Sequence, residues 1–308
     1  MKKTTILGLL ALLLCFSLTG CKGSDYKKAI SLEEAGDYSA ALEIYKEISD
    51  YKDSADHIAS CEAIISAIDG YEAAKADAES KNATLDTEIS NAESIISEGK
   101  TALDDTLIPT LETAISETKA AKVLIPEMPS TVEEINKVAE ELNAINYDEV
   151  IETLHVQKDA LETSIKQYSL VDAPSEGYII QCLSKIPNIV DISAVTEDND
   201  PNGKLNKAGG YTAQVYFSSD LVNQGSVLGS TVIEKGTDGG GSIEVYANVQ
   251  DAEKRNDYLA SFDGTLFASG SHTVVGTVLV RTSDELTASQ QKEMEANIIA
   301  ELTNIKNY

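Results

Sequence analysis

The spacing of apolar residues divides the chain into a helical part and a part that alternates like a sheet. From about residue 25 to residue 170, apolar positions recur every three or four residues among Ala, Glu, Lys and Ser, as on one face of a helix. Beyond residue 174, Gly, Val, Thr and Tyr become frequent, and residues 211–217 alternate between apolar and polar. The pattern predicts a helical region followed by a smaller domain of strands and helices.

Two runs in the helical part have the heptad spacing of coiled coils. Apolar residues step by four, three and four over 85–96, and the pattern returns over 150–168. Between these runs, the proline-containing segment 125–129 is typical of a helix stop. We therefore expect a coiled-coil-like stalk over 71–170, in which a long helix goes out, the prolines make a turn and helices come back antiparallel.

The final part contains four apolar or alternating runs that we expect to be strands. They cover 189–195, 211–217, 243–246 and 273–280, and the last is apolar enough for a central strand. A helix predicted between the last two runs resembles a crossover connection. The expected fold class is thus α + α/β, in which the helical part precedes a small mixed sheet with helices on one face.

The first twenty residues have the three parts of an export signal. Lys2 and Lys3 precede an apolar run over 6–14, which is too short to span a bilayer, and small residues lead to Cys21. We expect the signal 1–20 to be cleaved before Cys21 and the thiol to carry lipid, which would anchor the chain outside the cell membrane. An ordinary secretory signal followed by a chance cysteine is the alternative.

Charge excludes one class of partner. The chain has 24 basic and 51 acidic residues, and loss of Lys2 and Lys3 with the signal leaves 22 against 51, a net charge of −29. Such a chain should be repelled by nucleic acid. Beyond Cys15 in the signal and the lipidated Cys21, only Cys61 and Cys182 remain, and we expect two buried free thiols.

A short repeat opens the helical part. Ser-Asp-Tyr-Lys at 24–27 recurs at 49–52, with small and aromatic residues between them at the spacing of paired-helix repeats. The segment 25–65 resembles a degenerate tetratricopeptide-type repeat. Because about three such repeats are needed to bury a continuous core, we expect tetratricopeptide-like helices over 21–70 that cap the helices after them.

One loop has the oxygen spacing of a calcium site. Asp198, Asp200 and Asn202 occupy alternate positions before Gly203, as in the first half of a calcium-binding loop. Position twelve is Gly209 instead of the usual bidentate glutamate, so we expect an affinity of about 0.1 to 1 mM at best. The alternative is a tight polar connection built of turn-forming residues. No other cofactor is expected.

The remaining candidate chemistry is sparse. Among the three histidines, His272 lies at the start of the last predicted strand and is a candidate for ligand contact. Arg255 and Arg281 are the only arginines, and we expect them to pair with neighbouring acidic residues, a ligand carboxylate being the alternative. The sequence contains no nucleophile motif, and no paired carboxylates are placed at strand ends.

Several stretches beyond residue 175 carry a family resemblance. They are 194–203, 236–246, 258–264 and 270–277. They resemble an uncharacterised C-terminal domain of Gram-positive surface lipoproteins, called EbhA-like, which implies a domain over 174–308 and a surface location and brings no catalytic residues. We expect a non-enzymatic lipoprotein whose α/β domain binds an envelope or extracellular protein or polymer. An envelope hydrolase or transferase with a site near His272 is the alternative.

Overall fold

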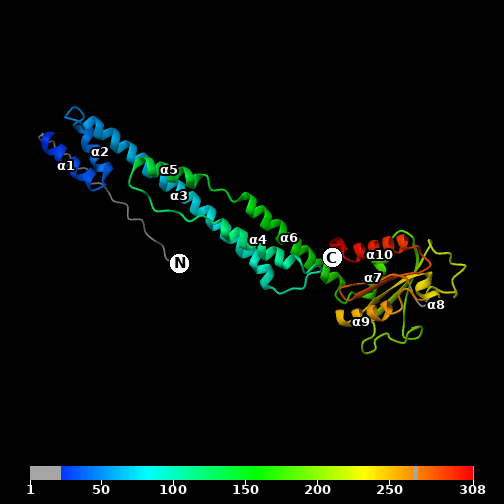
Figure 1. Cartoon of the computed structure of the whole chain (residues 1–308). Coiled ribbons are helices and arrows are strands. Elements are labelled where there is room, and N and C mark those ends of the chain that lie inside the picture. Colours follow the sequence, from blue (N-terminus) through cyan, green and yellow to red (C-terminus); the bar gives the residue numbers. More distant parts are fainter. Residues whose placement is uncertain (1–21, 266–269, 308) are drawn as a thin grey trace. The chain divides into compact units, whose positions relative to one another are not determined.

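The computed structural model describes residues 22–265 and 270–307, which form two compact units. One unit contains residues 22–85 with 122–147, and the other contains 86–121 with the chain from 148 onward. Helices dominate the N-terminal part, and a small five-stranded sheet with helices follows (Figure 1). The expected fold class, helical region plus small α/β domain, is confirmed. The signal 1–20 and Cys21 lie outside the described residues.

The first unit begins with two helices that pack through small side chains. α1 (Lys22–Glu34) and α2 (Tyr38–Glu47) are joined at Gly36, whose φ of +82° lies in the left-handed region that glycine adopts without strain. Asp37 caps α2 by accepting a hydrogen bond from Ala40 N. The buried core is made of Ala29, Ala41, Tyr45 and Cys61. Alanines at the contact allow the two helices to approach closely.

The rest of this unit is the first part of α3 (Ser54–Ser97) and a non-helical segment that precedes α5 (Val132–Asn143). In that segment, Pro126 O accepts a hydrogen bond of 2.8 Å from the Tyr71 hydroxyl, and Val123 O accepts one of 3.0 Å from Asn82 Nδ2. The prolines therefore lie in an extended strip along α3. Proline restricts the residue before it to extended conformations, which explains the shape.

In the second unit, α4 (Leu107–Ala121) and α6 (Asp148–Val171) pack with the end of α3. Lys119 of α4 pairs with Glu93 of α3, and His155 of α6 lies 2.8 Å from Glu88 of α3. Lys119 contacts Glu93 and the later residue Val123 contacts the earlier residue Asn82, so the chain reverses between α3 and α4, ahead of the prolines. Tyr147 contacts Asn82 and His155 contacts Glu88, so α6 runs in the direction of α3. The expected antiparallel hairpin with one proline turn is wrong, because two reversals bring the later helices back in parallel.

The sheet is antiparallel throughout, in the order β1-β2-β3-β5-β4. Its strands are β1 (Ile189–Ala194), β2 (Ala213–Ser219), β3 (Gly240–Val245), β4 (His272–Val275) and β5 (Val278–Thr282). The expectation of a mixed sheet is wrong in this respect. The run 273–280, expected as one central strand, is a hairpin that turns at Gly276, where φ is +58°. β4 is therefore an edge strand.

Helices cover both faces of this sheet, not one face as expected. α7 (Glu176–Leu183) and α10 (Ala288–Leu302) lie on one side, and α9 (Val249–Ala260) lies on the other (Figure 1). Side chains alternate along a strand, so each strand supplies both cores. Phe217 and Val280 pack under α7 and α10, whereas Tyr216 and Leu279 pack on the side of α9. The short helices α8 (Val232–Lys235), η1 (Gly236–Gly239) and η2 (Ile305–Asn307) complete the fold.

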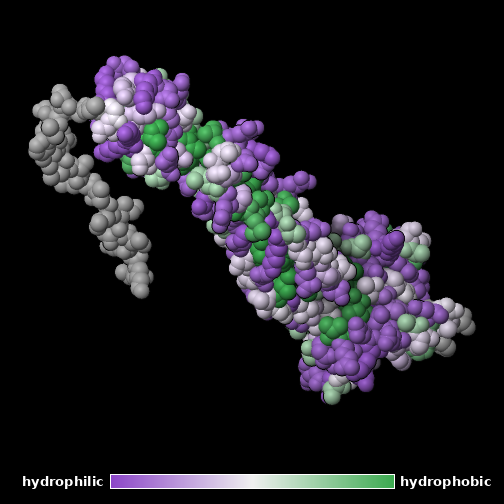
Figure 2. Space-filling model, turned by 60° about the vertical axis from the view of Figure 1, so that its left-hand side comes forward, coloured by the Kyte–Doolittle hydropathy of each residue, from purple (hydrophilic) through white to green (hydrophobic). Residues whose placement is uncertain are grey.

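Hydrophilic side chains cover most of the face of the described residues seen in Figure 2. No helix among those residues has the length and apolar character to cross a bilayer. Cys61 and Cys182 are buried free cysteines, as predicted.

Candidate functional site

The most polar buried cluster of the α/β domain lies on the sheet face beneath α9. Glu244 of β3 is fully buried and accepts hydrogen bonds from both arginines of the chain. Arg281 Nη1 lies 3.0 Å from Glu244 Oε1, and Arg255 Nε lies 3.2 Å from Oε2. Arg255 Nη2 adds a third bond, of 3.5 Å, to Oε1, and the Tyr246 hydroxyl donates a fourth, of 2.6 Å, to Oε2. The expectation that the arginines pair with an acidic residue is confirmed, and a single carboxylate serves both.

The register of the sheet explains why these groups meet. Gln214 lies opposite Glu244, and Tyr216 lies opposite Ser242, which in turn lies opposite Arg281. Directly opposed residues of antiparallel strands share a face. A patch of polar side chains therefore lies at the centre of the sheet, on the face beneath α9.

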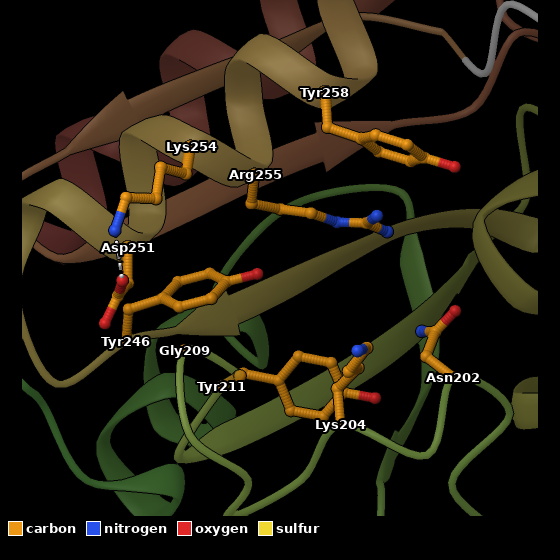
Figure 3. Close-up of a pocket in the computed structure, with 10 residues that line it drawn as sticks. Asn202, Lys204, Gly209, Tyr211, Tyr246, Asp251, Lys254, Arg255 and Tyr258 are labelled. Carbon is orange, nitrogen blue, oxygen red and sulfur yellow. Dashed lines mark hydrogen bonds and ion pairs between the residues drawn. The ribbon is translucent and has the colours of Figure 1, made fainter.

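A pocket of about 510 Å³ opens above this patch, between α9 and the loop from 196 to 212. The loop and the end of β3 contribute Asn202, Lys204, Gly209, Gly210, Tyr211 and Tyr246, and α9 contributes Asp251, Lys254, Arg255 and Tyr258. In Figure 3, Arg255 and Tyr258 project from α9 on one side, and Lys204, Tyr211 and Asn202 face them from the other. The volume of the pocket lies within the range of small-molecule binding sites, about 300 to 1,000 Å³.

Arg255 is the central charged group of the pocket. Its side chain is 24% exposed, and its guanidinium lies 5.4 Å from the centre of the Tyr258 ring. Burial acts to lower the pKa of Arg255, but the charge of Glu244 and the hydrogen bonds to it outweigh this effect and raise the pKa. Arg255 therefore stays protonated, held in one orientation by Glu244.

Two tyrosines of the pocket lining, Tyr211 and Tyr246, donate their hydroxyl hydrogen bonds to Asp200 and Glu244. Burial, together with hydrogen bonds to Asp200 and Glu244 respectively, raises the pKa of Tyr211 and of Tyr246. Both hydroxyls therefore stay protonated at neutral pH. Their rings are arranged edge to face with centroids 6.5 Å apart, and together they form an aromatic wall of the pocket.

Some buried polar atoms of the patch have no hydrogen-bond partner among the described residues. The amide nitrogen of Gln214 and the hydroxyl of Ser242 are among them. The Gln214 side chain lies behind the pocket, because its Oε1 is 3.5 Å from Nδ2 of Asn202 in the lining. An unsatisfied buried donor is costly, so it marks a place where water or a ligand oxygen would be bound favourably.

The candidate calcium loop lies at the rim of the same pocket, and its acidic oxygens already have partners. Asp200 accepts hydrogen bonds from Asn202 N at 2.9 Å, from Leu205 N at 2.8 Å and from the Tyr211 hydroxyl. Burial acts to raise the pKa of Asp200, but these hydrogen bonds together lower it. Asp198 is exposed. Calcium binding by Asp198, Asp200 and Asn202 stays a prediction, and Asp200 holds the loop together without a cation.

His272 lies away from this pocket, at the start of β4. Its Nδ1 is 2.7 Å from Asn256 Oδ1 and its Nε2 is 3.3 Å from Asp263 Oδ1. The nearby Ser271 hydroxyl contacts Glu295 instead of His272. Within residues 22–265 and 270–307, no three His, Cys, Asp or Glu side chains converge as a metal site. A catalytic role or ligand contact for His272 stays a prediction.

The sequence reasoning missed Glu244, Gln214 and the pocket itself. A usable signal was present, because polar residues occupy every second position of the segments that form β2 and β3, at 214, 216 and 218 and at 242 and 244. Regular alternation was interpreted as one solvent-exposed face, whereas α9 covers that face. Comparison of the chain with known protein families, with curated proteins and with solved structures found no match.

Proposed function

We propose that this chain is a non-enzymatic surface lipoprotein whose α/β domain binds an envelope or extracellular ligand in the pocket beneath α9. Lipid on Cys21 would hold the mature chain to the outside of the cell membrane, after removal of the signal 1–20. The helical region would serve as the stalk that presents the domain. The resemblance to EbhA-like lipoprotein domains supports the location.

The observation that carries the binding role is the buried cluster under the pocket. The chain has only two arginines, and both converge on the fully buried Glu244. Burying charges is costly, and a buried ion pair is often no more stable than apolar residues of similar volume. Since this cluster orients a guanidinium toward a pocket lined by tyrosines, recognition is the role that its geometry supports best.

The anchoring half of the proposal is tested by acylation in cells. Cys21→Ser should abolish incorporation of a palmitate analogue and release the chain into the medium after the signal is cut. Cys15→Ser makes the same chemical change six residues earlier, inside the signal, and should leave labelling unchanged. Continued labelling of Cys21→Ser, or its retention in washed membranes, would count against lipid on Cys21 as the anchor.

The binding half is tested with purified chain and envelope material. The chain should be retained by cell-wall polymer or by washed cells of the source organism, and Tyr258→Ala should reduce retention because this exposed ring lines the pocket. Leu228→Ala is the matched control, since Leu228 is 90% exposed and lies outside the pocket lining. Equal loss with both variants would indicate nonspecific adhesion of apolar side chains and would refute the pocket as the site.

A further inference from the structure

We propose that the pocket takes a molecule that carries a carboxylate or phosphate group on a hydroxylated ring, with the anionic group bound between Arg255 and Lys204. This inference rests on the proposed function, because it names the ligand of the same pocket. Sugar acids and sugar phosphates are the two sources of this chemistry.

The first argument is the free edge of the Arg255 guanidinium. Its Nε and Nη2 contact Glu244, at 3.2 and 3.5 Å, whereas Nη1 makes no hydrogen bond to any residue that the structure describes. The guanidinium fork matches the oxygens of carboxylate and phosphate. Since Glu244 already fixes the side chain, little conformational freedom remains to be lost when a ligand binds.

The second argument is the local sign of the charge. The lining contains Lys204, Lys254 and Arg255 against one carboxylate, Asp251, which lies 3.2 Å from Lys254. The Lys204 ammonium forms no ion pair within the described part of the chain. The chain as a whole carries −27, but at physiological salt a charge is screened beyond about 8 Å. Within this distance Glu244 offsets Arg255 and Asp251 offsets Lys254. Lys204 is therefore the cation of the lining without a carboxylate partner in the described part of the chain, and the anionic group is placed beside it.

The third argument concerns the body of the ligand. Tyr211, Tyr246 and Tyr258 supply aromatic surface, and Asn202 supplies an amide. The Tyr211 and Tyr246 hydroxyls donate to Asp200 and Glu244, so they offer a ligand only their acceptor oxygens. The unsatisfied Gln214 amide behind Asn202 offers a further donor to a ligand oxygen or a bridging water. A pocket of about 510 Å³ has room for one sugar ring and its substituents. Ring faces and many short polar groups suit a hydroxylated ring better than an apolar ligand.

The test is calorimetric titration of the chain from residue 22 with two matched pairs of probes. The first pair is galacturonic acid and galactose, and the second pair is glucose 6-phosphate and glucose. Within each pair, only the first member carries an anionic group. We expect the acidic member of at least one pair to bind about tenfold or more tightly than its neutral partner, the factor that a charge-assisted hydrogen bond provides. The pair with the larger ratio distinguishes carboxylate from phosphate.

Two variants in the same loop supply the matched control. Lys204→Gln should reduce the affinity for the acidic probe by about two- to fivefold, which corresponds to the free energy of an exposed ion pair. Lys207→Gln removes the same charge from an exposed position outside the pocket lining and should change affinity by less than twofold. Arg255→Lys keeps the charge beside Glu244 and loses the fork, so it should weaken binding by about tenfold or more.

Each other result overturns the inference. Equal affinity for acidic and neutral sugars would mean that the pocket binds sugars without using its cations. Equal effects of Lys204→Gln and Lys207→Gln on affinity would mean that the probe responds to the net charge of the protein and does not contact Lys204. If no probe binds but Tyr258→Ala still reduces retention by envelope material, the ligand class is wrong and the proposed function stands. If the Tyr258 effect is also absent, both are wrong.

Discussion

Replacement of Glu244 by glutamine tests whether the buried cluster is held by charge. Glutamine keeps the shape of the side chain, but it removes the negative charge that two arginines share and presents an NH₂ group to surrounding donors. Glu244 is fully buried, and the Arg281 side chain is 8% exposed, so solvent cannot replace the lost partner. Breaking a buried pair in this way costs about 3 to 5 kcal/mol.

This cost is measurable by urea unfolding of the chain. At a slope of about 2 kcal/mol per M, the midpoint of the transition that reports on the sheet should fall by about 1.5 to 2.5 M. Because the chain has two units, the sheet should be followed by hydrogen exchange of the amides in β2 and β3. Glu253→Gln, an identical change at an exposed position of α9, should stay within about 0.5 kcal/mol of wild type.

A double variant separates lost charge from lost packing. If the pair is held by charge, adding Arg255→Gln to Glu244→Gln should cost less than Arg255→Gln costs alone, because the partner is already gone. A loss below about 1 kcal/mol for Glu244→Gln, equal to that of Glu253→Gln, would refute the reasoning. Strict additivity in the double variant would likewise mean that the two side chains do not interact.

Two further predictions concern how the α/β domain is bounded and turned. Val171 is fully buried in the core under α7 and α10, and its carbonyl accepts a 2.9 Å hydrogen bond from Thr277 N. A fragment starting at residue 173 loses these contacts, so its free energy of unfolding should be about 1.5 to 3 kcal/mol lower than that of a fragment starting at residue 168. Chemical denaturation of the two fragments measures the difference. Gly276→Ala should lower the melting temperature, because φ at this residue is +58° and the added Cβ would lie 2.5 Å from Val171 O. Gly177→Ala in α7 is the control: its Cβ would meet nothing within 4 Å, so the melting temperature should be unchanged or higher.

Local periodicity was sufficient for much of the fold. The run 213–217 alternates and is a strand, and the apolar heptad positions Leu85, Ile89 and Leu154 are buried as a helical seam requires. These features depend on side chains a few residues apart, which the sequence displays directly. The tetratricopeptide-like and EbhA-like resemblances and the domain limits stay predictions.

Features that depend on distant residues were not accessible in this way. The run 273–280 is nearly all apolar, and no period within it distinguishes one central strand from a hairpin at Gly276. Strand order depends on which residues meet across the sheet, such as Glu244 opposite Leu279. The candidate site has the same origin, because Arg255, Glu244 and Arg281 come from three separate elements. Residue type predicted that the arginines would pair with acid, but only the register identifies Glu244.

The last prediction concerns the loop at the rim of the pocket. A carboxylate offers about four lone-pair positions, and Asp200 already accepts three hydrogen bonds, from Asn202 N, Leu205 N and the Tyr211 hydroxyl. Its lowered pKa gives these bonds a pH signature. The contribution of these hydrogen bonds to the free energy of unfolding should be complete above about pH 4, the pKa of Asp in an unfolded chain. It should be lost as the pH falls through the lower pKa that Asp200 has in the folded chain.

A cation that binds Asp200 would have to displace those donors, because their N–H and O–H hydrogens, which carry partial positive charge, already point at the carboxylate oxygens that the cation would use. Calcium at about 1 mM should therefore raise the melting temperature no more than magnesium does, both acting by screening the acidic chain. The measurement is calorimetry with each cation on wild type and on Asp198→Asn, which alters the exposed carboxylate and leaves the Asp200 hydrogen bonds in place. A rise specific to calcium in wild type, absent from Asp198→Asn, would mean that the loop rearranges to bind the ion. The weak calcium site expected from the spacing of Asp198, Asp200 and Asn202 would then be correct.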